Sequence, residues 1–143
     1  MRFVNYKVTL KGDTITIPLD RPCKCNVGLV EISIPEIESH EMDFNNAIDI
    51  TCDQINSTFD NPNRLLRRLP LSKIEPKKYY HTWEARFIQM EPVDSQDRFL
   101  TLKIRKTKNN ESLILGSIFD DYEIFLTLAY TDIDEPKTWT AYI

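Results

Sequence analysis

The chain has 143 residues, of which 41% are hydrophobic and 28% are charged, and its formal net charge is −4. These values fit one domain with its own core, over residues 1–143, and argue against a disordered chain. The longest apolar runs fall far short of the roughly 20 residues needed to span a bilayer. Acidic side chains exceed basic ones, which disfavours general nucleic-acid binding. We therefore expect no membrane span and no specific nucleic-acid partner.

The beginning of the chain and its cysteines bear on the compartment. Residues 1–7 lack the apolar segment of a secretory signal peptide. The cysteine count is three, and an odd number without a secretion signal favours reduced thiols in the cytosol or nucleus. We expect no structural disulfide framework.

Strands are predicted where apolar and polar residues alternate between breaks of Asp, Asn, Pro or Gly. The first half of the chain has such stretches at residues 4–10, 15–19, 26–34 and 47–52. A turn is predicted at residues 11–13. In the third stretch the apolar phase shifts at Leu29 and Val30, which predicts a bulge or burial on both faces. Polar loops are predicted at residues 36–45 and 53–63.

The second half of the chain continues the same pattern. Strands are predicted at residues 65–71, 79–90 (bent, with Trp83 and Phe87 as core candidates), 98–106, 112–118 and 122–130. Loops or turns are predicted at residues 72–78, 91–97 and 107–111. No helix is predicted, because the best candidate, residues 49–59, has no helical apolar stripe. The chain has only 3 glycines, so long crossing connections fit better than tight hairpins. We predict an all-β fold, a single jelly-roll β-sandwich of about eight antiparallel strands.

The last core strand and the tail after it carry exposed apolar residues. Alternation directs Ile124, Leu126, Leu128 and Tyr130 to the core and Phe125 to the opposite face. An outward Phe125 suggests that this face is covered, either by the tail or by a neighbouring subunit. The C-terminal tail, residues 131–143, ends in an apolar stretch that contains Trp139 and Tyr142. Such a stretch is expected to pack on its own sandwich or to dock on a neighbour.

No motif for catalysis, a metal or a cofactor is recognised. The only two histidines, His40 and His81, are far apart and adjoin no nucleophile motif. Cys23 and Cys25 resemble half of a zinc site, yet only one further cysteine is present. The neighbouring acids Asp120 and Asp121 fit a solvated turn better than a calcium or glycosidase site. The sequence therefore predicts a protein that is not an enzyme and binds no cofactor.

One segment is densely basic. Residues 64–68 contain Arg64, Arg67 and Arg68. This segment could meet an acidic neighbouring subunit or a nucleic acid, and the acidic loop at residues 36–43 could be its partner patch. Equally, it could be an edge strand that charge protects from aggregation. We carry both interpretations, and we count the three arginines, Phe125, Trp139 and Tyr142 as candidate subunit-interface residues.

Several segments, taken in order, resemble a known protein family. Residues 27–35 read VGLVEISIP, residues 50–55 read ITCDQI, and LLR follows at residues 65–67. Further on, EPV occupies residues 91–93, FLTLKI residues 99–104 and LTL residues 126–128. The succession resembles the penton (minor capsid) proteins of Polinton/Maverick elements, adintoviruses and virophage-like eukaryotic DNA viruses, and it covers roughly residues 15–130.

The resemblance implies a function as well as a fold. It implies a single jelly roll whose copies form a homo-pentamer at the vertices of an icosahedral capsid, next to a major capsid protein. The protein would then be made in the host cytoplasm or nucleus and reside in the virion capsid. The alternative from the residues alone is a non-catalytic jelly-roll module that recognises a sugar or peptide through exposed aromatics such as Tyr79, Tyr80, Trp83 or Trp139.

Overall fold

The structure is a computed structural model, which describes residues 1–35, 47–70, 80–84, 87–107, 110–112, 121–134 and 138–140. All regular secondary structure in these ranges is β-strand. In chain order the strands are β1 (Arg2–Lys11), β2 (Thr14–Pro18), β3 (Lys24–Pro35), β4 (Ala47–Cys52), β5 (Leu65–Pro70), β6 (Tyr80–Glu84), β7 (Phe87–Gln89), β8 (Glu91–Asp94), β9 (Phe99–Lys106), β10 (Asp121–Thr131) and β11 (Thr138–Thr140). The predicted all-β character is confirmed.

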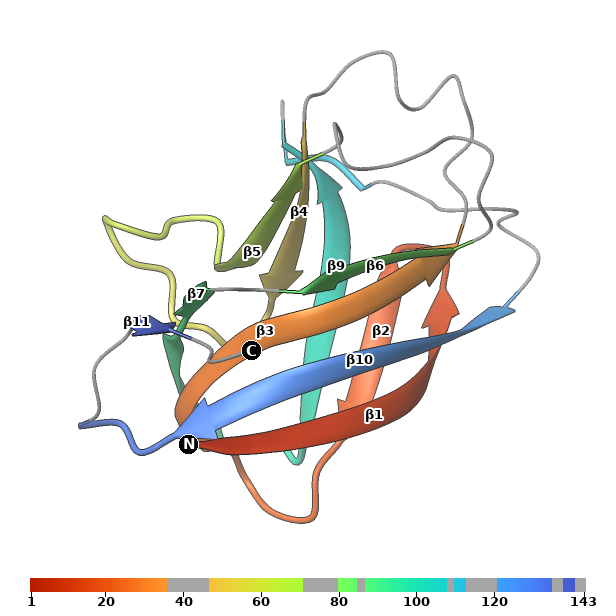
Figure 1. Ribbon diagram of the computed structural model, residues 1–143. Helices are drawn as coiled ribbons and strands as arrows, with labels where there is room; N and C mark the ends of the chain where they lie inside the picture. Colours follow the sequence, from red (N-terminus) through yellow and green to blue (C-terminus); the bar gives the residue numbers. More distant parts are fainter. Residues whose placement is uncertain are drawn as a thin grey trace.

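Eight of the strands form one antiparallel path that folds into two facing layers. The path runs β5-β4-β9-β2-β1-β10-β3-β6. We call β1, β10, β3 and β6 the front layer, and β2, β9, β4 and β5 the back layer, which crosses behind it in Figure 1. Two residue pairs join the layers at their shared edge, Leu10 with Ile15 and Lys11 with Thr14. Successive main strands alternate between the layers except at the β4–β5 hairpin. This is a jelly roll, as predicted.

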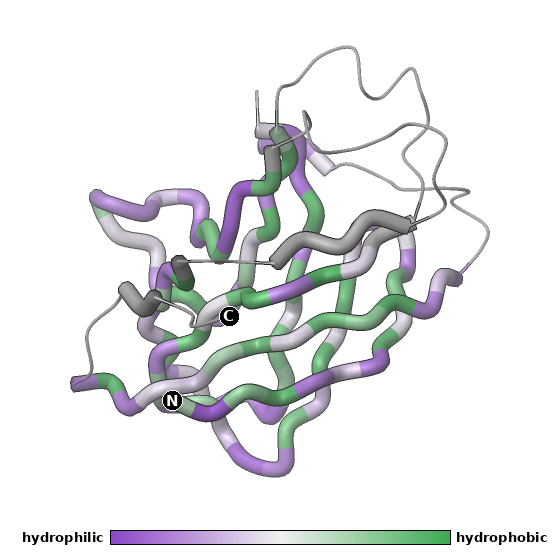
Figure 2. Tube along the Cα trace, viewed as in Figure 1, coloured by the Kyte–Doolittle hydropathy of each residue, from purple (hydrophilic) through white to green (hydrophobic). Residues whose placement is uncertain are grey.

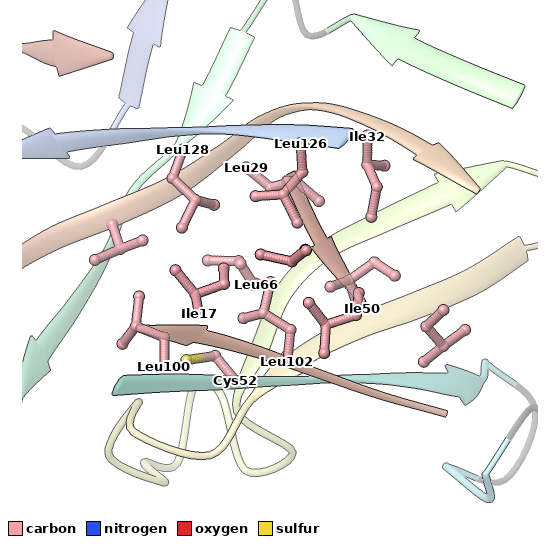
Figure 3. Close-up of a cluster of buried hydrophobic side chains, with 14 of the residues drawn as sticks. Ile17, Leu29, Ile32, Ile50, Cys52, Leu66, Leu100, Leu102, Leu126 and Leu128 are labelled. Carbon is pink, nitrogen blue, oxygen red and sulfur yellow. The ribbon is translucent and has the colours of Figure 1, made fainter. Parts of the chain in front are cut away.

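Buried aliphatic side chains fill the space between the layers (Figure 3). The front layer contributes Leu29, Ile32, Leu126 and Leu128, and the back layer contributes Ile17, Ile50, Cys52, Leu66, Leu100 and Leu102. Each buried aliphatic side chain stabilises the fold by about 1.5–3 kcal/mol relative to exposure. Ile124 and Tyr130 are also buried, which confirms the inward positions predicted for β10. The alternation is visible as green and purple along the strands in Figure 2.

A bulge in β3 appears where the sequence predicted it. Thr127 pairs with Glu31 and Leu128 pairs with Leu29, so Val30 is the extra residue opposite β10. Because the bulge shifts the alternation by one residue, Leu29 lies in the core between the layers while Val30 packs in a second cluster outside it. The predicted bulge is confirmed, and it places Leu29 and the partly buried Val30 on opposite faces of the front layer.

A ribbon of β7 and β11 covers one end of the outer face of the front layer. The two strands pair over three residues each. Ile88 and Met90, at and just beyond β7, are buried against Ala129 of β10 and Val30 of β3. Gly28 makes this close approach possible. A Cβ at that position would lie 2.6 Å from both Ile88 Cγ2 and Met90 Sδ, which is well inside normal contact distance.

Two predictions for the middle of the chain are wrong. Residues 79–90 do not hold one bent strand, because β6 pairs with β3 whereas β7 leaves the sheet to pair with β11. Residues 91–94 are not a turn but the strand β8, which pairs with the first residues of β3. The physical reason is the length of β3, whose edge holds β6 and β8 one after the other. The predicted loops at 36–45 and 72–78 and nearly all of the strand at 112–118 lie outside the described residues.

Candidate functional site

The uncovered part of the front layer presents an exposed aromatic ring among polar side chains. Phe125 is 55% exposed and stands opposite Lys7 of β1. Lys7 Nζ lies 3.2 Å from Glu123 Oε1, and Thr127 Oγ1 donates a hydrogen bond to Asn5 Oδ1 at 2.6 Å. We call these five residues the Phe125 surface. The predicted outward orientation of Phe125 is confirmed.

The described part of the C-terminal tail packs on its own chain, away from Phe125. Trp139 lies in β11 at the register position opposite Ile88 of β7. Tyr142 lies outside the described residues. Residues 138–140 therefore belong to the ribbon at the covered end of the front layer, and Phe125 stays exposed in the single chain.

Arg67 crosses from the back layer to the front layer. Its Nη1 donates to the carbonyl oxygens of Leu29 and Val30, at 3.1 and 3.0 Å. These carbonyls flank the β3 bulge. Burial lowers the pKa of Arg67, yet a guanidinium remains protonated in proteins. The Arg67 side chain thus links β5 of the back layer to β3 of the front layer.

The other two arginines of the basic segment differ from Arg67 and from each other. Arg68 forms a bidentate pair with the buried carboxylate of Asp49, at 2.8 and 3.1 Å. That hydrogen bond raises the pKa of Arg68. Arg64 is exposed and has a positive φ of 56° in the turn before β5. Simple alternation missed this division of roles, because the register between β4 and β5 shifts between Ile50 and Thr51.

A cysteine pair lines a pocket where β1, β3 and β10 end or begin. Cys23 Sγ and Cys25 Sγ are 3.4 Å apart. Tyr6 and Tyr130 share a hydrogen bond of 2.6 Å between their hydroxyls, and Arg2 lies over the Tyr130 ring at 5.1 Å from its centroid. The pocket has a volume of about 720 Å³. We call it the dithiol pocket, after its two cysteines; its lining also includes Arg2, Asp20, Arg21, Lys24, Tyr130, Thr131 and Asp132.

The three cysteines have different electrostatic surroundings. A hydrogen bond from Cys23 and the charges of Arg2 and Arg21 hold the pKa of Cys25 below its usual value. The same hydrogen bond, together with burial, raises the pKa of Cys23. Cys52 is fully buried in the core, and burial raises its pKa to about 11. Sequence spacing indicated the Cys23–Cys25 pair, but only the fold brings Arg2 and Tyr130 beside it.

The loop that connects β4 and β5 carries an exposed aromatic side chain at its tip. Phe59 is 99% exposed in that loop. Sequence analysis identified the loop by its polar composition and did not single out Phe59. An isolated Phe in a run rich in Asn, Ser and Asp is the signal that marks it.

Within the described ranges, no three His, Cys, Asp or Glu side chains gather into a group that could hold a metal ion. The same ranges contain no helix of the length and hydropathy needed to cross a membrane. His40, one of the two histidines considered above, lies outside these ranges. No protein-family model matches this chain, and no curated protein sequence matches it.

Proposed function

We propose that this chain is a structural subunit of a viral capsid, a penton (minor capsid) protein that forms pentamers at icosahedral vertices. The jelly-roll strand order carries the proposal, because viral capsid domains are a principal use of this fold. The resemblance of residues 27–35, 50–55 and 99–104 to penton proteins supports it. In this role the pentamer would contact a major capsid protein in the virion, after synthesis in the host cytoplasm or nucleus.

The surfaces of the chain suit a ring of identical subunits. A closed ring of this kind uses two different patches that meet head to tail. Phe125 on the front layer and Phe59 at the β4–β5 tip are exposed aromatics on different elements. Aromatic anchors ringed by polar side chains are typical of interface centres. We assign the Phe125 surface to one patch and the Phe59 tip to the other.

The three arginines have different roles in this proposal. Arg67 is engaged inside the chain and Arg68 is paired with Asp49. Arg64 and Arg68 are both exposed, but Arg64 extends from the same β4–β5 connection as Phe59. The interface roles predicted for Arg67 and Arg68 therefore give way, in this proposal, to Arg64 and Phe59.

Electron microscopy of the purified full chain tests the proposed function. We expect rings of five subunits, or shells with five-fold vertices. A particle that stays a single chain at high concentration and binds a glycan or peptide would instead support the jelly-roll binding module. A tetramer or dimer with two-fold symmetry would also overturn the pentameric assignment.

A further inference from the structure

The dithiol pocket combines a thiol pair with open access. Cys23 immediately precedes β3 and Cys25 is the second residue of that strand, and their Sγ atoms lie 3.4 Å apart. A disulfide bond is about 2.05 Å long. The sulfur atoms therefore need to approach by only a little over ~1 Å to bond. Cys23 is buried, whereas Cys25 is partly exposed and lines the pocket.

The charged residues of the pocket indicate the kind of ligand it would take. The lining carries three cations, Arg2, Arg21 and Lys24, against the two acids Asp20 and Asp132. The surplus of cations favours an anionic ligand.

We propose that the dithiol pocket binds an anionic low-molecular-weight disulfide of the glutathione type and exchanges with it. The Cys25 thiolate attacks one sulfur of the ligand, whose S–S bond breaks, and half of the ligand leaves as a thiolate. Cys23 then gives up its proton and attacks Cys25 Sγ, which releases the second half. The two cysteines lose two electrons and two protons, and the ligand is reduced to two thiols.

The surroundings of each cysteine suit its step. Thiolates, rather than thiols, are the nucleophiles in disulfide exchange. Cys25 has a lowered pKa and faces the pocket, so it is the attacking group. Cys23 has a raised pKa while it donates to the Cys25 thiolate. Once Cys25 carries a mixed disulfide, that hydrogen bond is lost, and Cys23 becomes easier to deprotonate. The inference does not depend on the capsid proposal.

Cys52 provides an internal control. It is fully buried, and its Sγ donates to Gln54 Oε1 at 3.6 Å. The apolar surroundings keep this thiol protonated at neutral pH. In the unfolded chain a disulfide reagent would modify all three cysteines equally, whereas in the folded chain the first attack is expected at Cys25.

The experiment exposes the reduced full chain to glutathione disulfide and follows it by intact mass and peptide mapping. We expect loss of two hydrogen atoms, a Cys23–Cys25 link, and a reaction at Cys25 at least about tenfold faster than at Cys52. Cys23→Ser should stop at one glutathione attached to Cys25. Cys25→Ser should slow the reaction at least about tenfold, and Cys52→Ser should behave like the unsubstituted chain.

Alkylation of the folded chain by iodoacetamide across pH supplies a readout that does not require the cysteine variants to fold. Labelling of Cys25 should reach half of its maximum below the pH of an ordinary thiol, and Arg2→Gln should move that midpoint upward. Equal labelling of all three cysteines, or a mixed disulfide that never converts to the Cys23–Cys25 link, would overturn the proposal.

Discussion

The two ends of the outer face of the front layer differ in what covers them. At one end, Gly28, Val30 and Ala129 lie beneath the β7–β11 ribbon, and the contact is apolar and close-packed. At the other end, Phe125 stands exposed between the Lys7–Glu123 ion pair and the Thr127–Asn5 hydrogen bond. The strand β10 contributes to both ends.

The side chains explain the difference. Small or absent side chains at Gly28 and Ala129 let another strand approach, and the buried apolar contact then stabilises the single chain. Charged side chains beside Phe125 stay solvated in the single chain, which suits the proposed subunit interface better than a core. The covered end therefore adds to the stability of the subunit, and we propose that the open end mediates its association.

The largest expected change comes from filling the contact at the covered end. Gly28→Val places a branched side chain where even a Cβ would meet Ile88 and Met90 at 2.6 Å. We expect the free energy of unfolding, measured by urea titration, to fall by about 3 kcal/mol.

Gly12→Asn is the matched control for this glycine. Gly12 has a positive φ of 63°, and a Cβ at that position would have nothing within 4 Å, while Asn tolerates that backbone conformation. We expect a change below about 0.5 kcal/mol. Equal losses for the two variants would show that the β7–β11 ribbon does not press on β3.

A smaller loss of stability is expected from removing the Arg67 guanidinium, which reaches the β3 bulge. Arg67→Met keeps the long apolar stem but leaves the Leu29 and Val30 carbonyls without their guanidinium donor. We expect thermal or urea unfolding to show a loss of about 2 kcal/mol. Arg64→Met, at an exposed position in the same segment, should stay within about 0.5 kcal/mol. If Arg67→Met is also neutral, Arg67 does not fasten the layers.

The Lys7–Glu123 ion pair at the open end should contribute least to the stability of the subunit. Lys7 and Glu123 are more than half exposed, and such pairs contribute about 0–1 kcal/mol. Lys7→Met should therefore change the free energy of unfolding by less than about 0.5 kcal/mol, with an even smaller change at high salt. A loss above about 1 kcal/mol would mean that the open end also supports the folded subunit.

The sequence predicted the parts of this account that depend on local alternation. Most strand positions, the bulge at Val30 and the outward Phe125 all follow from the pattern of apolar residues in one segment. The β7–β11 ribbon did not follow, because three-residue strands carry too little pattern to identify their partners. Arg67 was assigned to a surface since alternation alone does not show that the β4–β5 register shifts.

The dithiol pocket illustrates the same limit for a site. The spacing of Cys23 and Cys25 is visible in the sequence, and a strand start predicts that both sulfurs share one side. Tyr6 and Tyr130 are 124 positions apart, and their contact arises only because β1 and β10 pair along their full length. Arg2 reaches the pocket for the same reason.

The central claim is that subunits associate through the open end of the front layer. Light scattering of the purified chain and of Phe125→Ser tests it most directly, with Phe99→Ser as a control at another exposed ring, on β9 of the back layer. We predict five times the 16.8 kDa monomer mass for the unsubstituted chain and for Phe99→Ser, and a single chain for Phe125→Ser. A Phe125→Ser variant that keeps the unsubstituted mass, or an unsubstituted chain that is monomeric, would contradict the account.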